Sequence, residues 1–191
     1  QEEVDALRSF LNEGGKWFGL HGTNALIEFV GEMQIVDGLE IPGKTDTPNK
    51  NPELMELLGS RFVAHPPNMS IKVKVNDKSH PITKDLNDFE IFDEPYYCEF
   101  SDGIKVLLES RYTDDADAYV HSSWKEDIPR PQMYLHKVGK GGVLYLMLGH
   151  CRGKYDMRPF MDECPVDRGG WESEAFYELL RRGIKWGINK I

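Results

Sequence analysis

The sequence predicts a layered α/β fold in which helices cover both faces of a mainly parallel β-sheet. Helical and buried-strand patterns alternate in the first third of the chain, and the chain ends in a strand, a loop and a helix. A hairpin-like extension across residues 104–148 would make the sheet mixed. The length of 191 residues fits a single domain over residues 1–191.

The first elements are predicted from apolar spacing. Apolar residues recur at helical spacing in residues 2–11, and residues 16–20 have the composition of a short buried strand. Residues 25–30 are predicted to form a second helix, capped by Thr23 or Asn24. A doubly wound sheet usually begins with a strand, so a further β-α unit ahead of this chain is expected in the native protein.

The middle of the chain is predicted to alternate between loops and regular elements. Residues 37–49 are rich in Gly, Pro, Thr and Asp, which favours a surface loop. Asn51, followed by proline and glutamate, is typical of a helix start, and Gly59 of a helix end. Residues 70–76 alternate between apolar and polar side chains, which predicts a half-buried strand.

The last third contains the strongest patterns. Residues 104–108 and 142–148 are dense apolar runs typical of central strands, and residues 131–138 are predicted to pair with the second run across a Gly-Lys-Gly turn. Residues 151–170 form a long charged connection. The final helix is predicted within residues 172–190 from one apolar stripe, with acidic residues early and basic residues late.

The composition narrows the classes of function. A net charge of -9 argues against a nucleic-acid-binding protein and against an anionic membrane surface as partner, and it leaves a neutral substrate such as a sugar open. No apolar run approaches the about 20 residues of a membrane-spanning helix. Cys98, Cys151 and Cys164 predict free thiols in a reducing compartment, hence a cytoplasmic location. A removed signal peptide stays open, because the chain begins inside a predicted helix.

Two histidines and one carboxylate are the main candidates for chemistry. His21 and His150 each follow a predicted buried strand, and sites in open α/β sheets gather at the carboxyl ends of strands. Glu94 lies in a rigid Asp-Glu-Pro-Tyr segment. Imidazole and carboxylate groups suit a divalent metal such as zinc, and they also suit proton transfer without a metal. His21, Glu94 and His150 are therefore predicted as catalytic residues and as metal ligands.

Other residues are expected around these three. His80 and Tyr96 are predicted to contact the substrate, and an aromatic ring of Tyr96, Tyr97, Trp124 or Trp171 could stack on a sugar. His65 stands in a second His-Pro step, where packing or capping is the favoured role. The sequence lacks a glycine-rich dinucleotide motif, a phosphate loop and the common zinc spacings, so no nucleotide cofactor is expected.

Six segments carry a further signal when they are taken in order. They are residues 14–22 (GGKWFGLHG), 59–66 (GSRFVAHP), 80–83 (HPIT), 93–96 (DEPY), 139–150 (GKGGVLYLMLGH) and 183–186 (GIKW). Together they resemble the trehalose-utilisation (ThuA-like) family. The resemblance implies a flavodoxin-like three-layer sandwich related to class I glutamine amidotransferases, with a role in sugar and disaccharide catabolism. It also implies that a first β-α unit is missing here, and that residues 151–170 are a lid, a partner contact or a plain insertion.

Three functions compete on this basis. The first is an enzyme acting on a sugar or an oxidised sugar derivative. The second is a non-catalytic sugar-binding or regulatory module on the same fold. The third, a residual amidotransferase or cysteine hydrolase using Cys151 beside His150, is disfavoured because adjacent residues rarely adopt nucleophile–base geometry. The resemblance also places His21 where an amidotransferase has its cysteine, so thiolate chemistry is not expected. A homo-oligomer is possible through exposed-looking aromatics such as Tyr155.

Overall fold

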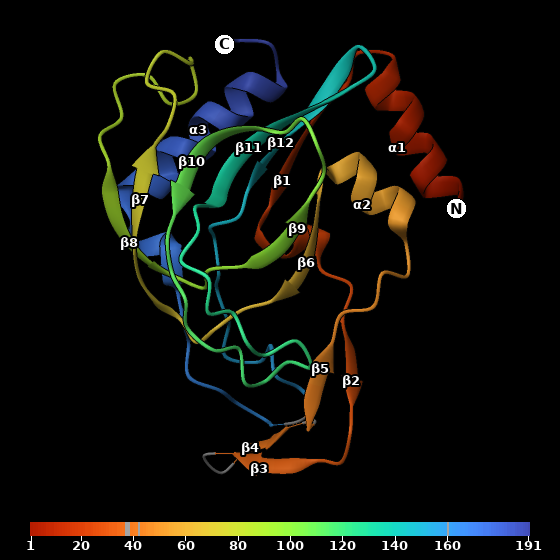
Figure 1. Ribbon diagram of the computed structural model, residues 1–191, viewed down its shortest axis with the longest axis vertical. Helices are drawn as coiled ribbons and strands as arrows, with labels where there is room; N and C mark the ends of the chain where they lie inside the picture. The colour runs from red at the N-terminus through yellow and green to blue at the C-terminus, as the bar shows by residue number, and fades with distance from the viewer. Residues whose placement is uncertain (37–38, 42, 160) are drawn as a thin grey trace.

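The computed structural model describes residues 1–36, 39–41, 43–159 and 161–191 (Figure 1). The α-helices are α1 (Glu2–Asn12), α2 (Pro52–Leu58) and α3 (Glu174–Gly187), and the 3-10 helices are η1 (His21–Asn24) and η2 (Gly169–Glu172). The strands are β1 (Lys16–Leu20), β2 (Glu28–Val30), β3 (Gln34–Val36), β4 (Leu39–Ile41), β5 (Lys44–Asp46), β6 (Ser60–Ala64), β7 (Met69–Val75), β8 (Phe89–Asp93), β9 (Tyr97–Phe100), β10 (Lys105–Ser110), β11 (Arg130–Val138) and β12 (Gly141–Leu146).

The main sheet has six strands in the order β1-β12-β11-β10-β7-β8. Only the β1–β12 pair is parallel within it, and the other pairs are antiparallel. The prediction of a mainly parallel sheet is therefore wrong, while a mixed α/β fold is confirmed. The physical reason is connectivity: β11 returns directly into β12, and β7 into β8, without the crossover helix that parallel pairing needs.

The two faces of the sheet are covered by different elements. Phe18 of β1 packs against α3 on one face, and the next residue, Gly19, points to the other face beside its β12 partner Tyr145. On that second face, the Tyr134 hydroxyl donates a hydrogen bond to the carbonyl oxygen of Leu58 in α2. Figure 1 shows α3 behind the sheet, with α2 and the β6–β9 pair in front.

A separate arm replaces the second predicted helix. After η1, the chain forms β2, which pairs with β5, and then β3, which pairs with β4 (Figure 1). The helix over residues 25–30 is wrong because Glu28–Val30 find hydrogen-bond partners in β5. The loop predicted for residues 37–49 contains β4 and β5 instead, and its residues 37, 38 and 42 lie outside the described residues.

Several other elements agree with the sequence. Asn51 caps α2 by accepting a hydrogen bond from the Leu54 N–H at 3.1 Å, and Gly59 ends it in the left-handed conformation. β7 has the alternating burial that its sequence predicts. The β11–β12 hairpin and the final helix are also confirmed. No helix among the described residues has the length and apolar character needed to cross a membrane.

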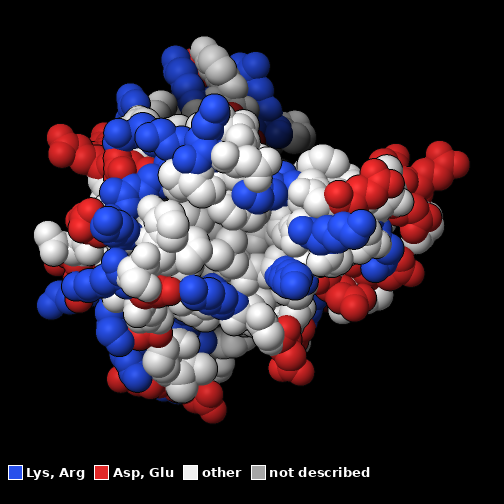
Figure 2. Space-filling view, turned by 90° about the horizontal axis from the view of Figure 1, so that it is seen from above, with Lys and Arg blue, Asp and Glu red and all other residues white. Residues whose placement is uncertain are grey.

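Charge is unevenly distributed over the surface. Figure 2 shows the upper end of the molecule in Figure 1, where Lys and Arg side chains surround an uncharged centre and acidic side chains gather to one side. This end lies beside the β11–β12 turn, away from the carboxyl ends of β1 and β12. The basic side chains seen in this view are therefore at the opposite end of the sheet from the predicted site.

Candidate functional site

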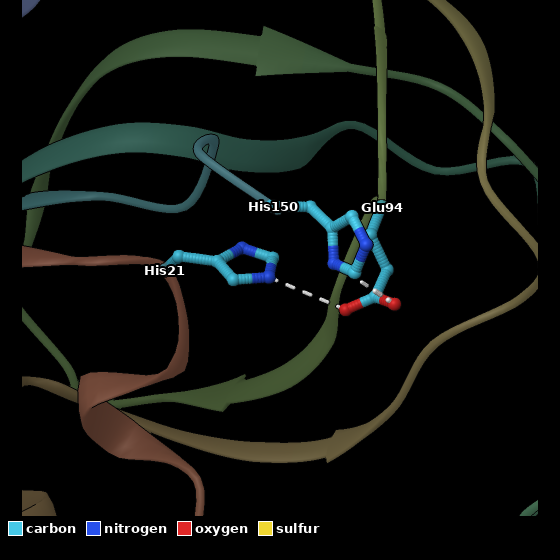
Figure 3. A group of neighbouring side chains, drawn as sticks. All are labelled: His21, Glu94 and His150. Atoms are coloured by element: carbon cyan, nitrogen blue, oxygen red, sulfur yellow. Dashed lines mark ion pairs between the residues drawn. The ribbon is translucent and has the colours of Figure 1, made fainter. Parts of the chain in front are cut away.

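The three predicted ligands converge from three separate elements (Figure 3). His21 is the first residue after β1, Glu94 follows β8, and His150 follows the end of β12. His21 Nε2 lies 3.2 Å from Glu94 Oε2, and His150 Nδ1 lies 3.3 Å from Glu94 Oε1. One ligand atom from each residue lies within 4.8 Å of the other two. The side chains are largely buried, so water competes little with these contacts.

Two further residues join this cluster. His65, directly after β6, places its Nε2 3.3 Å from Glu94 Oε1. Asp167, in the long charged connection, places Oδ2 3.6 Å from His150 Nε2. The sequence favours a packing or capping role for His65, because the pattern of residues 60–64 does not by itself indicate a strand. Asp167 carried no signal, because its contact depends on how the connection folds back.

Each of the three imidazoles lies between two hydrogen-bond acceptors. His21 Nδ1 is 2.8 Å from the Met147 carbonyl oxygen, and His65 Nδ1 is 2.8 Å from the Pro66 carbonyl oxygen. Their Nε2 atoms face Glu94. A neutral imidazole has one N–H, so it can satisfy only one of two acceptors. A carbonyl oxygen only accepts, so a neutral imidazole that donates from Nδ1 turns its Nε2 lone pair toward the carboxylate, whereas a second proton on Nε2 lets the imidazole donate a hydrogen bond to Glu94. The arrangement therefore calls for additional positive charge at Glu94, either protons or a cation.

The pKa values of the cluster follow from burial and mutual contact. Burial acts to raise the pKa of Glu94, but hydrogen bonds to His150 and His21 outweigh it and hold that pKa well below its usual range. Burial lowers the pKa of His65. Burial also acts to lower the pKa of His150, but the hydrogen bond to Glu94 and the charges of Glu94 and Asp167 outweigh it and raise that pKa. Glu94 is thus ionised across the physiological range.

The backbone of His21 is fixed by its neighbours. Its φ of 38° is in the left-handed region, which is uncommon for a residue with a side chain. The Tyr145 hydroxyl donates to the His21 carbonyl oxygen at 2.6 Å and accepts from the Asn24 N–H at 2.8 Å. Tyr145 reaches this position because Gly19 has no Cβ, which would lie 2.9 Å from the ring. The strand–turn geometry predicted for His21 is therefore present, although no helix of ordinary length follows it.

The aromatic side chains predicted to contact a sugar mostly pack against other residues of the protein. The Tyr96 ring stacks on the His21 ring, with 4.3 Å between their centroids. The centroid of the Phe62 ring lies 4.4 Å from that of Tyr96. Tyr97 stacks on Trp124 at 4.5 Å. Trp171 donates from Nε1 to the Gly149 carbonyl oxygen at 3.0 Å. Tyr96 therefore belongs to the site by position, but these contacts make it and the other rings part of the packing around it.

His80 is not brought to the site. Met69 pairs with Asp93 at the site end of the β7–β8 pair, whereas His80 follows the far end of β7. Its Nδ1 accepts a hydrogen bond from the Ile82 N–H at 3.3 Å, which stabilises a local turn. The prediction that His80 contacts the substrate therefore lacks structural support. The thiol of Cys151 is exposed and makes no hydrogen bond to another described residue.

Comparison with known proteins finds a family model and several solved structures to which this chain is similar. A family model described as trehalose utilisation (ThuA) matches residues 41–164, which contain His65, Glu94 and His150 but not His21. The comparison with curated proteins found no match. A putative ThuA-like protein from Bacteroides uniformis has a TM-score of 0.61 at 19% identity, covering 97% of this chain and 63% of that one.

Two further solved structures are similar. A putative ThuA-like protein from Parabacteroides merdae has a TM-score of 0.59 at 18% identity, covering 98% of this chain and 65% of that one. A protein described as cytoplasmic from Salmonella typhimurium LT2 has a TM-score of 0.50 at 16% identity, covering 98% and 58%. The chain spans less than two thirds of the length of each, and at these identities the likeness concerns the fold. Because the family model covers more than half of the chain, the protein belongs to the trehalose-utilisation (ThuA) family.

Proposed function

We propose that this protein binds a divalent metal ion, zinc first among them, between His21, His150 and Glu94, and that it acts on a sugar or an oxidised sugar derivative. One observation carries the proposal. Several imidazoles surround the ionised carboxylate of Glu94, and each of them has a hydrogen-bond acceptor near both of its ring nitrogens. A cation at Glu94 satisfies these acceptors without charging several buried histidines at once.

The donor set fits such a metal. Two imidazole nitrogens and a carboxylate oxygen are common ligands of catalytic zinc, which keeps a further position open for water or substrate. The Met147 carbonyl fixes the Nδ1–H of His21 and so leaves Nε2 free to bind. Asp167 lies next to the other nitrogen of His150, as outer carboxylates do at many metal sites. A bound divalent metal would polarise a substrate oxygen or lower the pKa of a bound water.

The sugar class rests on the family and on the charge of the site. The family is described by trehalose utilisation. Glu94, Asp93 and Asp167 bring three carboxyl groups to the cluster. No ion pair with Lys or Arg is found for these three among the residues that the structure describes. This balance favours a neutral polyhydroxylated substrate over a phosphorylated one.

Metal analysis tests the proposal. Protein purified without chelator is expected to contain near-stoichiometric zinc or another divalent metal, and His21→Ala and His150→Ala are expected to lose it. His80→Ala is the matched control, because His80 is a partly buried histidine outside the cluster. Wild-type protein without metal, and without uptake on titration, would reject the metal site.

Incubation with sugars separates the two remaining functions. A product that forms with wild type, and not with the His21→Ala or His150→Ala variant, supports an enzyme. Saturable sugar binding without any product after prolonged incubation supports the non-catalytic sugar-binding or regulatory module instead. The metal measurement is independent of this outcome, because a structural metal would bind in either case.

Location and assembly belong to the same proposal. Cys98, Cys151 and Cys164 are all free, and the similar Salmonella protein is described as cytoplasmic, which supports a cytoplasmic location.

Tyr155 is 51% exposed and is available to a homo-oligomer interface. Sedimentation of wild type and Tyr155→Ala tests that assembly.

A further inference from the structure

Asp93 is a buried carboxylate that joins the two ligand-bearing segments. Its side chain is completely buried at the end of β8. Oδ1 accepts hydrogen bonds from the Glu94 N–H at 2.8 Å and the His150 N–H at 3.0 Å, and Oδ2 accepts one from the Gly149 N–H at 2.9 Å. One side chain thus binds the backbone of Glu94 and of His150 at the same time.

The position of these segments in the sheet makes this link important. β8 is an edge strand, and β7, β10 and β11 lie between it and β12. Among the strands that the structure describes, no backbone ladder joins β8 directly to β12, so direct pairing does not set the distance between the residue after β8 and the residues after β12. Asp93 connects these two strand ends directly by accepting hydrogen bonds from the Gly149 and His150 N–H groups, while its third hydrogen bond comes from the adjacent Glu94 N–H.

The 3-10 helix η2 covers this carboxylate. A Cβ at Gly170 would lie 2.3 Å from Asp93 Oδ2, and a Cβ at Gly169 would lie 2.5 Å from the His150 carbonyl oxygen. Trp171 then donates a hydrogen bond to the Gly149 carbonyl oxygen. The two glycines allow η2 to pack directly on Asp93 and His150, which keeps water from the Asp93 hydrogen bonds and makes them stronger.

We infer that Asp93 is the positioning residue of the site, and that its carboxylate sets the spacing between Glu94 and His150. The inference rests on the proposed function for its effect on metal binding. The geometric part of the inference does not depend on a metal. Without the Asp93 carboxylate, the segment that carries His150 shifts relative to Glu94. Asp93 does not touch the metal position itself, so it acts only through the two residues that it holds.

Substitution of Asp93 by asparagine tests the inference. Asparagine keeps the size but replaces one oxygen by an N–H donor that would face a backbone N–H. Asp93→Asn is expected to raise the dissociation constant for zinc at least about tenfold, as loss of outer-sphere partners typically does. Asp88→Asn is the matched control, because Asp88 accepts a backbone hydrogen bond from Val75 at the far end of the same hairpin. It is expected to bind zinc as wild type does.

A second pair of variants keeps the test valid if Asp93→Asn fails to fold. Gly170→Ala leaves the charge in place but pushes a methyl group toward Asp93 Oδ2. It is also expected to weaken zinc binding. Gly187→Ala is its control, because a Cβ there meets nothing within 4 Å. Zinc affinity equal to wild type in folded Asp93→Asn and Gly170→Ala overturns the inference and leaves the proposed metal site standing.

A metal-free measurement separates the two ideas. Long-range proton–nitrogen NMR spectra of the imidazoles report the environment of each histidine without any metal. Asp93→Asn is expected to move the His150 signals and to leave those of His80 and His136 in place, since these two lie outside the cluster. If wild type binds no metal, the proposed function fails, and these spectra alone decide the inference. Unchanged His150 signals then reject it.

Discussion

Glu94 is the residue on which the other side chains of the site depend. It is largely buried, yet it is ionised because imidazole nitrogens lie close to both of its oxygens. A buried charge of this kind is stable only with partners of opposite charge or strong donors. Each imidazole in turn needs either a second proton or a cation, so the charge state of Glu94 and that of its neighbours are coupled.

The raised pKa of His150 gives a prediction for metal-free protein. A pKa raised on folding means that protonated His150 stabilises the fold below pH 6.5, and that this contribution is lost as the pH rises through the folded value. In the presence of chelator, the free energy of unfolding of wild type relative to His150→Gln should therefore be largest just below pH 6.5 and fall at higher pH. Denaturant unfolding across this range measures it. A difference that stays constant with pH contradicts the prediction.

At the scale of elements, α3 packs closely against β1, the strand that leads to His21. Gly183 in the middle of α3 approaches the Phe18 ring so closely that a Cβ would lie 2.2 Å from it. Glycine normally weakens a helix by about 1 kcal/mol relative to alanine, so its presence here has a packing reason. The helix can lie flat on β1 only without that side chain.

Two alanine substitutions in this helix should have opposite effects. Gly183→Ala is expected to lower the free energy of unfolding by about 1–3 kcal/mol, because overpacking outweighs the better helix propensity. Gly187→Ala in the same helix meets nothing within 4 Å and should be neutral or stabilising by up to about 1 kcal/mol. Thermal and denaturant unfolding measure both. Equal stabilisation by the two substitutions would show that Gly183 is not in close contact with Phe18.

Short elements were the least predictable from the sequence. Residues 25–30 contain apolar residues that fit one side of a helix as well as a strand, and pairing with β5 decided the outcome. The short strand β6 precedes His65, yet only its pairing with β9 shows it to be a strand. Longer or strongly patterned elements, such as α3 and β7, formed as their sequences indicate because a clear period needs no distant partner.

At the scale of the whole molecule, metal binding and folding should be linked. A ligand that binds only the folded state stabilises it, by about 2.7 kcal/mol at a free concentration one hundred times its dissociation constant. Zinc should therefore raise the melting temperature of wild type. Glu94→Gln should abolish most of this rise, because an amide is a poor metal ligand. His80→Ala should keep the full rise. A similar zinc-induced rise in Glu94→Gln would place the metal elsewhere.

The sequence by itself determined the longer or strongly patterned elements and predicted three residues of the candidate site. Apolar period, caps and turn glycines are local features, so they place α2, β7, the β11–β12 hairpin and α3 correctly. His21 and His150 could be predicted because each follows a recognisable strand, and Glu94 because it lies in the proline-fixed Asp-Glu-Pro-Tyr segment. These signals lie within a few residues of the side chains they concern.

Only the tertiary structure decided which strands pair and which residues meet. The sheet is mostly antiparallel, whereas the sequence predicts a mainly parallel one. The ends of β8 and β12 meet although three strands lie between them in the sheet. The tertiary structure added His65 and Asp167 to the cluster and placed His80 at the far end of β7. The physical reason is that strand order and curvature depend on contacts between residues far apart in the chain, which no local pattern encodes.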